Sequence, residues 1–133
     1  VVPGHPLAPH VAAPAKAILA FQPRDIVDRP LSGPLPKLSE SSKTDRVEIE
    51  QEYEQVRQRD YATCWNEMEN GLGAIAVPVP LPMVGVVYSI GTAGLVDRLV
   101  QKPEQEIVDT LRSAVGAMTR ALRGSAEKAP ERI

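Results

Sequence analysis

The sequence has 133 residues, 24% of them charged, and a formal net charge of −2. Its length fits one domain with its own core, and its slightly acidic balance excludes a basic surface for nucleic acid. Cys64 is the single cysteine, which excludes an internal disulfide and fits a reducing cytoplasm. No apolar run approaches the ~20 residues that span a bilayer, and the first residues lack a signal-peptide pattern. We therefore expect a cytoplasmic protein that does not contact a membrane.

A first helix is predicted after an irregular start. Residues 1–9 contain three prolines and a glycine, which disfavour regular structure. Pro14 suits the first helical position because its missing N–H has no partner there in any helix. The helix is expected to end near Phe21, because Pro23 restricts the residue before it.

A proline-rich connector and a second helix follow. Pro23–Leu38 predicts a connector with one short helical turn near Asp25–Asp28. After polar Ser39–Lys43, Thr44 or Asp45 is expected to cap a helix that runs to about Arg59. This helix has a narrow apolar stripe of Ile49, Tyr53 and Val56. The other residues of this helix, including Glu52 and Arg57, are mostly charged and predict a face exposed to solvent. The alternative is that this helix forms a contact between subunits of an oligomer.

The middle of the chain predicts three antiparallel strands. The β-like runs are Tyr61–Asn66, Gly73–Val79 and Val84–Ala93. Asn70-Gly71 and Pro80-Leu81-Pro82 mark the two turns between them. A final helix over about Pro103–Arg123 is expected to cover the sheet with Ile107, Leu111, Val115, Met118 and Leu122. Gly124 is the expected stop, and residues 124–133 are expected to form a frayed tail.

The predicted sheet has two unequal faces. Side chains alternate across a strand, so each run divides by parity. One face is bulky and carries Tyr61, Thr63, Trp65, Ile75, Val77, Val79, Val86, Tyr88 and Ile90. The other is small and carries Ala62, Cys64, Asn66, Ala74, Ala76, Pro78, Ser89, Gly91 and Ala93. Small residues predict either a helix packed closely on this face or a cavity beneath it.

The chemistry-bearing residues do not form a catalytic or metal-binding motif. Cys64 with His5 or His10 would need a spatial proximity that the spacing does not indicate, and a lone strand cysteine is typical of a core. The two histidines and one cysteine lack the spacing of a metal site. No phosphate-binding glycine loop or nucleophile elbow is present. We expect no enzyme activity, no cofactor and no metal.

Four segments resemble the effector domains of isocitrate-lyase-regulator (IclR) transcription regulators. Residues 11–20, VAAPAKAILA, resemble the family's T-A-x-G-K-A-x-L-A, and Val56–Tyr61 resembles v-R-x-x-G-Y. Glu67 to Val79 is similar to E-x-x-x-G-x-x-a-i-A-x-P-V, and Val86–Ala93 followed by Asp97-Arg98 fits the closing strand. The series runs in order from Leu7 to Leu122.

The resemblance implies the fold class and the partners. It implies an α/β (α+β) fold of the GAF-like type, with an antiparallel sheet flanked by helices. Residues 1–133 would then form a single effector-binding domain truncated at its N-terminus. DNA would be bound only by a separate winged helix-turn-helix domain that these residues do not contain. A homodimer or homotetramer and a small-molecule effector are the implied partners.

The resemblance also places an effector pocket between the sheet and the turn that opens the first helix. Carried over by position, its lining would be Leu7, Ala13, Pro14, Cys64, Leu72, Ala74, Gly91 and Ala93. Four of these, Cys64, Ala74, Gly91 and Ala93, lie on the small face found by parity, which favours the cavity over close packing.

Departures from the family pattern predict the class of effector. Pro14 removes one backbone donor at the helix start, and backbone donors there suit an anion. Cys64 stands where an acidic side chain occurs in the family, and Gly91 and Ala93 stand where serines occur. The pocket should therefore be wider and less polar than one for glyoxylate or pyruvate, and its effector apolar or aromatic. The alternatives are an oligomerisation module without a ligand and a small cysteine-dependent enzyme.

Overall fold

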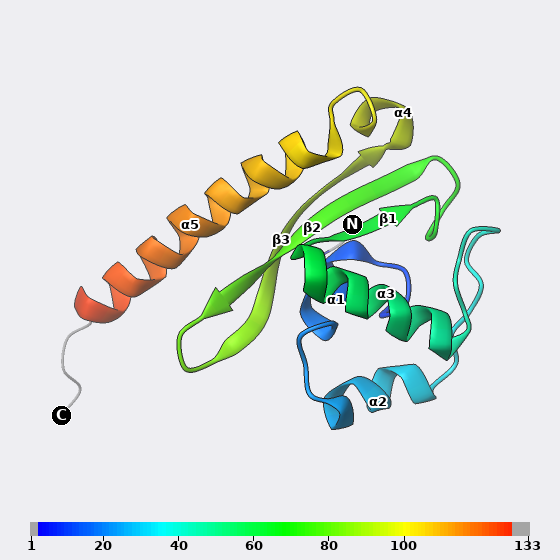
Figure 1. The fold of residues 1–133 in the computed structure, drawn as a ribbon, viewed down its shortest axis with the longest axis horizontal. Coiled ribbons are helices and arrows are strands. Elements are labelled where there is room, and N and C mark those ends of the chain that lie inside the picture. The colour runs from blue at the N-terminus through cyan, green and yellow to red at the C-terminus, as the bar shows by residue number, and fades with distance from the viewer. Residues whose placement is uncertain (1–2, 129–133) are drawn as a thin grey trace.

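A three-stranded antiparallel sheet lies between helices on its two faces in the computed structural model (Figure 1). The structure describes residues 3–128, and the side chains of residues 3–124. The elements are α1 (Ala13–Leu19), α2 (Arg24–Ser32), α3 (Arg46–Arg59), β1 (Ala62–Trp65), β2 (Leu72–Leu81), β3 (Gly85–Leu95), α4 (Val96–Leu99) and α5 (Glu104–Lys128). The predicted α+β class, with an antiparallel sheet flanked by helices, is confirmed.

The predicted elements are found, most of them with boundaries shifted by one or two residues. The turn expected at Pro80-Leu81-Pro82 begins later, because Pro80 and Leu81 still belong to β2. The turn expected near Asp25–Asp28 is the nine-residue helix α2, which contains Pro30. Pro30 forgoes one helical hydrogen bond, but the helix buries Val27 and Leu31 in the core, and tertiary packing of this kind stabilises short helices. The four-residue helix α4 was not predicted from the sequence, because it is too short to show a period.

Helix α3 begins as predicted, and α5 ends later than predicted. The Asp45 carboxylate accepts a hydrogen bond from the Val47 N–H, and Asp60 adopts the left-handed conformation at the C-terminus of α3. Helix α5 continues through Gly124 to Lys128, so the predicted stop is wrong. A glycine inside a helix costs only about 1 kcal/mol, so it permits a stop without enforcing one. Of the expected frayed tail, residues 129–133 lie outside the described residues.

The strand registers confirm the two faces derived from parity. Strand β2 is central, and β1 and β3 flank it. Across the sheet the pairs are Ala62 with Ala76, Cys64 with Ala74, Ala74 with Ala93, Ala76 with Gly91 and Pro78 with Ser89. These pairs make one continuous small face. On the other face Thr63 pairs with Ile75, Val77 with Ile90 and Val79 with Tyr88, whereas a bulge after Val79 pairs Val86 with Pro80.

Helix α5 covers the bulky face. Ile75 and Val77 of β2 are fully buried against Val108 and Leu111 of α5. Ile107 and Val115 are partly buried in the same cluster. The helix therefore packs through its N-terminal half. Leu122, expected to lie on the sheet, is 41% exposed.

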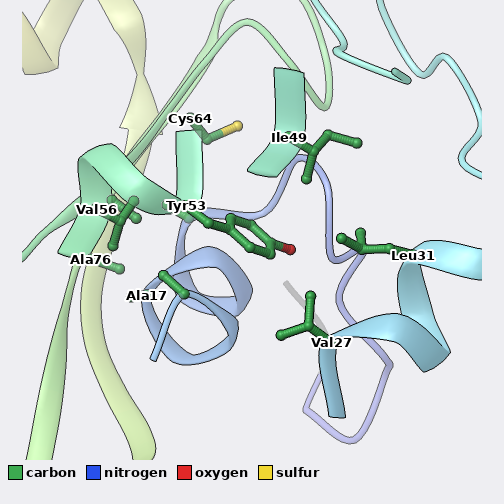
Figure 2. Packing of buried hydrophobic residues seen from close by; sticks show 11 residues of the cluster. Ala17, Val27, Leu31, Ile49, Tyr53, Val56, Cys64 and Ala76 are labelled. Atoms are coloured by element: carbon green, nitrogen blue, oxygen red, sulfur yellow. The ribbon is translucent and has the colours of Figure 1, made fainter. Parts of the chain in front are cut away.

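Helix α1 lies on the small face, and α2 and α3 join it in one buried cluster. Figure 2 shows Tyr53 of α3 pointing into the cluster between α1 and α2, with its ring close to Val27 and Leu31. Small side chains of the sheet, Ala62 and Ala76, allow α1 to approach closely, and Ala17 packs there. None of the described helices is long and apolar enough to cross a membrane.

Candidate functional site

A hollow of about 330 Å³ lies at the end of the small face that α1 does not cover. We use "the hollow" for the space lined by His5, Pro6, Leu7, Cys64, Met68, Leu72, Gly73, Ala74, Ala93 and Gly94. All three strands contribute to it, and the N-terminal segment and the turn between β1 and β2 close its sides. Both explanations of the small face therefore hold, each for a different part. The helices pack against Ala62 and Ala76, and Cys64 and Ala74 lie at the edge of that cluster, where they border the hollow together with Ala93.

Five of the eight predicted site residues line the hollow. They are Leu7, Cys64, Leu72, Ala74 and Ala93. Two others lie elsewhere. Ala13 is fully buried in the core at the start of α1. Pro14 lines a neighbouring groove between α1 and β3, which shares Leu7 with the hollow.

Gly91, the eighth predicted residue, does not line the hollow. It pairs with the buried Ala76 of β2 and is itself exposed. A Cβ atom there would lie 2.9 Å from the Ile75 carbonyl oxygen and 3.1 Å from the Ala76 Cβ. The glycine at this position is therefore explained by the close approach of β2, and it requires no ligand.

Two hydrogen bonds hold the N-terminal segment beside the sheet. The Tyr53 hydroxyl donates to the Pro9 carbonyl at 2.7 Å. The His10 Nε2–H donates to the Pro36 carbonyl at 2.8 Å, which places the proton on Nε2 because a carbonyl only accepts. His10 is buried, and the segment before it, His5–Leu7, forms one side of the hollow.

Cys64 lies at the base of the hollow as a neutral thiol. Burial raises its pKa, and the negative charge of Glu67 raises it further. The Lys16 ammonium and the backbone amides of Met68 and Glu67 act in the opposite direction but are outweighed. A nucleophilic cysteine needs a lowered pKa, so this environment suits a wall residue.

A buried group of charges lies beside the hollow. The Lys16 ammonium, fully buried, donates to Glu52 Oε1 at 2.5 Å, to Glu67 Oε1 at 2.6 Å and to the Thr63 carbonyl at 3.0 Å. Lys43 donates to Glu52 Oε2 at 2.9 Å. We call Lys16, Lys43, Glu52 and Glu67 the ion cluster. Its two positive and two negative groups balance: Lys16, Glu52 and Glu67 are buried, and Lys43 closes the cluster from the surface.

This cluster was not predicted from the sequence. Glu52 was expected on a solvated helix face near Arg57, but it is 7% exposed and faces Lys16, while Arg57 pairs with Glu54. One sequence signal could have indicated its burial. Glu52 lies three residues after Ile49 and directly before Tyr53, which is the buried side of α3.

Lys16 and Lys43 determine the ionisation of Glu52. Burial opposes the charged form of Glu52, but the charges and hydrogen bonds of the two lysines outweigh it. The pKa of Glu52 therefore lies below its usual value. The carboxylate remains ionised at neutral pH and keeps the cluster complete.

Acid is expected to weaken the fold through Glu52. Because its pKa is lowered on folding, the unfolded chain takes up this proton at a higher pH than the folded chain does. The stabilisation is complete above the unfolded pKa of about 4.3 and is lost as pH falls through the lower folded pKa. Urea unfolding from about pH 6 to about pH 3 should show this loss, and Glu52→Gln should show less of it.

Glu54→Gln is the matched control for this measurement. The pKa of Glu54 is also lowered, by a hydrogen bond from Arg57, but its side chain is 53% exposed and water screens the pair. Glu54→Gln should therefore retain the acid-dependent loss of the unmodified chain. An equal loss in the unmodified chain and in Glu52→Gln would contradict the prediction.

A second concave surface contains none of the predicted site residues. A groove of about 470 Å³ between α4 and the start of α5 is lined partly by Lys102, Glu104 and exposed Val100. Within residues 3–128, no three His, Cys, Asp or Glu side chains gather as a metal site would require.

Solved structures that resemble this chain are transcription regulators. A protein assigned as an IclR regulator from Silicibacter sp. TM1040 is 28% identical, with a TM-score of 0.77 over 86% of this chain and 45% of its own. The C-terminal domain of Escherichia coli KdgR is 27% identical, with a TM-score of 0.76 over 84% of this chain and 68% of its own. The chain thus spans under half of the Silicibacter regulator.

The inducer-binding domain of PobR from Acinetobacter, solved with 3-hydroxybenzoic acid, shares the fold. It is 23% identical, with a TM-score of 0.76 over 83% of this chain and 66% of its own. No curated protein sequence matches this chain. The model of the family described as bacterial transcriptional regulator IclR C-terminal matches residues 3–120. With its GAF-like α+β fold, the chain belongs to the family of IclR C-terminal domains of bacterial transcription regulators.

Proposed function

We propose that this chain is the effector-sensing domain of a cytoplasmic IclR-family regulator and that its effector binds in the hollow. The observation that carries the proposal is the gap beneath Cys64, Ala74 and Ala93, where the cover of helices over the small face ends. The gap joins residues of three strands and the N-terminal segment, so a bound molecule would contact all of them. DNA binding would belong to a separate winged helix-turn-helix domain, because this chain is slightly acidic.

The lining favours an apolar or aromatic molecule with one polar end. Most of it is aliphatic, from Leu7, Met68 and Leu72 to the small residues at the base. An apolar cavity of about 150 Å³ accommodates benzene, so about 330 Å³ accommodates a substituted ring. His5, exposed on the hollow's side, offers a ring nitrogen to a carboxylate or hydroxyl group.

The effector would act by shifting a conformational equilibrium. A molecule that prefers one arrangement of the domain stabilises it by no more than its difference in affinity between the arrangements. In a homodimer or homotetramer, that shift would alter how the DNA-binding domains are placed. Cys64 would serve as a wall of the hollow, which its raised pKa supports.

A thermal-shift screen of small acids tests this function. The probes are 3-hydroxybenzoate, benzoate, phenylacetate and hexanoate, with glyoxylate and pyruvate as small polar controls. A specific ligand at 100 times its Kd stabilises the native state by about 2.7 kcal/mol, so Tm should rise with concentration. We expect a rise with at least one of the aromatic or longer acids and none with the two controls. If no acid raises Tm, the result favours an oligomerisation module without a ligand. If glyoxylate alone raises Tm, the predicted apolar or aromatic class of effector is wrong.

A further inference from the structure

We propose that Lys16 is a positioning residue, which fixes the turn beside the hollow and ties that turn to α3. The proposal rests on the hollow being the effector site. Lys16 itself does not line the hollow, so its effect would pass through Glu67 and Glu52.

The first part of the inference concerns the turn between β1 and β2, residues 66–71. Met68 of this turn lines the hollow, and Glu67 precedes it. Glu67 does not face water: it is 7% exposed, with Oε1 on Lys16 at 2.6 Å and Oε2 on the Trp65 N–H at 3.1 Å. The turn therefore has one end held from inside the protein.

The second part concerns the strength of this attachment. Lys16 reaches the Thr63 carbonyl of β1 as well as Glu67, so one ammonium group holds both the strand and the turn that follows it. Moving Glu67 away would remove one of the two carboxylates that the buried Lys16 ammonium contacts. Breaking a buried ion pair is strongly destabilising, so the turn has little freedom while the pair stands.

The third part concerns α3. The same ammonium bonds Glu52 of α3 at 2.5 Å, so the turn and the helix share one cation. A second link runs through the connector before α3, where the Ser42 hydroxyl donates to the Glu67 carbonyl at 2.5 Å. A bound molecule that displaces Met68 would therefore strain both the Lys16 contacts and the Ser42 hydrogen bond. The geometry thus joins the hollow to a helix whose outer face is exposed and charged.

Cys64 provides a readout that needs no effector. It is the single cysteine, it is 3% exposed, and it lines the hollow near the turn. Its alkylation by iodoacetamide therefore reports how often the hollow opens around it. Local opening gives a rate that does not change at low urea, whereas global unfolding gives a rate that rises with urea.

The test compares Glu67→Gln and Lys16→Met with Lys43→Met. Lys43 contacts the same Glu52 carboxylate, but its side chain is 44% exposed and has no hydrogen bond to the turn. We expect urea-independent alkylation of Cys64 to be at least ~10-fold faster in the first two variants, as expected for local opening, and unchanged in Lys43→Met. If Lys16→Met does not fold, Glu67→Gln decides the outcome.

An electrostatic effect on the thiol would give a different pattern. Glu67 raises the pKa of Cys64 and Lys16 lowers it, so removing each charge shifts the thiolate fraction in opposite directions. Faster alkylation in both variants would therefore report opening. The proposal would be overturned if Cys64 were alkylated at the same rate in all three variants, or if the rate rose in one of Glu67→Gln and Lys16→Met and fell in the other. It would also be overturned if the rates followed global unfolding.

A second arm separates this proposal from the proposed function. Alkylation of Cys64 in the unmodified chain is repeated with saturating 3-hydroxybenzoate, or with the acid that raises Tm most. Protection by the acid without any difference between variants would overturn the role of Lys16 and leave the effector site standing. A difference between variants without protection would overturn the effector site and leave the positioning role standing.

Discussion

The Lys16→Met variant is expected to lose about 3–5 kcal/mol of unfolding free energy, which is a large part of the about 5–15 kcal/mol that holds a domain folded. Methionine keeps the unbranched stem but removes the ammonium that lies 2.5 Å from Glu52 and 2.6 Å from Glu67. Glu52 retains Lys43, but Glu67 keeps no cation within ion-pair distance among the described residues. The cost arises from the buried carboxylates that remain, more than from the bond that is lost.

A triple variant distinguishes these two sources of cost. Lys16→Met with Glu52→Gln and Glu67→Gln removes the carboxylate charges together with the ammonium. Because neutral replacement of a whole buried group is often close to neutral in stability, the triple variant should be more stable than Lys16→Met alone. Urea denaturation measures the unfolding free energy of both variants, provided that their m-values equal that of the unmodified chain. A loss below about 1 kcal/mol in Lys16→Met would contradict the burial of the cluster.

The Ala93→Phe variant is expected to lose ligand affinity by at least ~100-fold, which is about 2.8 kcal/mol. Ala93 of β3 lies opposite Ala74, at the part of the sheet where the hollow forms. A phenylalanine there would occupy space that we assign to the effector, and its ring would take the place of an aromatic ligand. Phenylalanine also has a high β propensity, so the strand should tolerate it.

Thr92→Phe is the matched control for Ala93→Phe. Thr92 is the preceding residue of the same strand and pairs with Ile75 on the opposite face of the sheet. The Thr92→Phe substitution adds the same ring to the strand, but on the face that does not line the hollow. Calorimetric titration with the best acid from the thermal-shift screen should give unchanged affinity in Thr92→Phe. Unchanged affinity in both variants would place the effector elsewhere.

Gly91 shows why filling the hollow requires a particular residue. Parity alone makes Gly91 as good a choice as Ala93, since both lie on the small face. In the structure a Cβ at Gly91 would meet the Ile75 carbonyl at 2.9 Å, so a larger side chain there would strain the sheet. Loss of binding in such a variant would not locate a ligand. Ala93 lines the hollow, which makes it the informative position.

The ion cluster shows a different limit of prediction. Lys16 is one of several helix-forming residues in α1, and Glu52 is one of many charges in α3. The two carboxylates that Lys16 contacts, Glu52 and Glu67, lie 36 and 51 residues after it in the sequence. No local spacing connects residues so far apart, and a buried lysine is rare, so surface positions were the reasonable expectation.

Most of the elements, the two faces of the sheet and the family could be predicted from the sequence. These follow from local rules: side chains alternate along a strand, prolines and capping residues bound the helices, and family motifs recur in order. Tertiary structure alone decided which part of the small face α1 covers and which part stays open. It also decided that Lys16 is buried between two carboxylates. Both depend on contacts between residues distant in the chain, where packing and charge balance, and not local preference, determine the outcome.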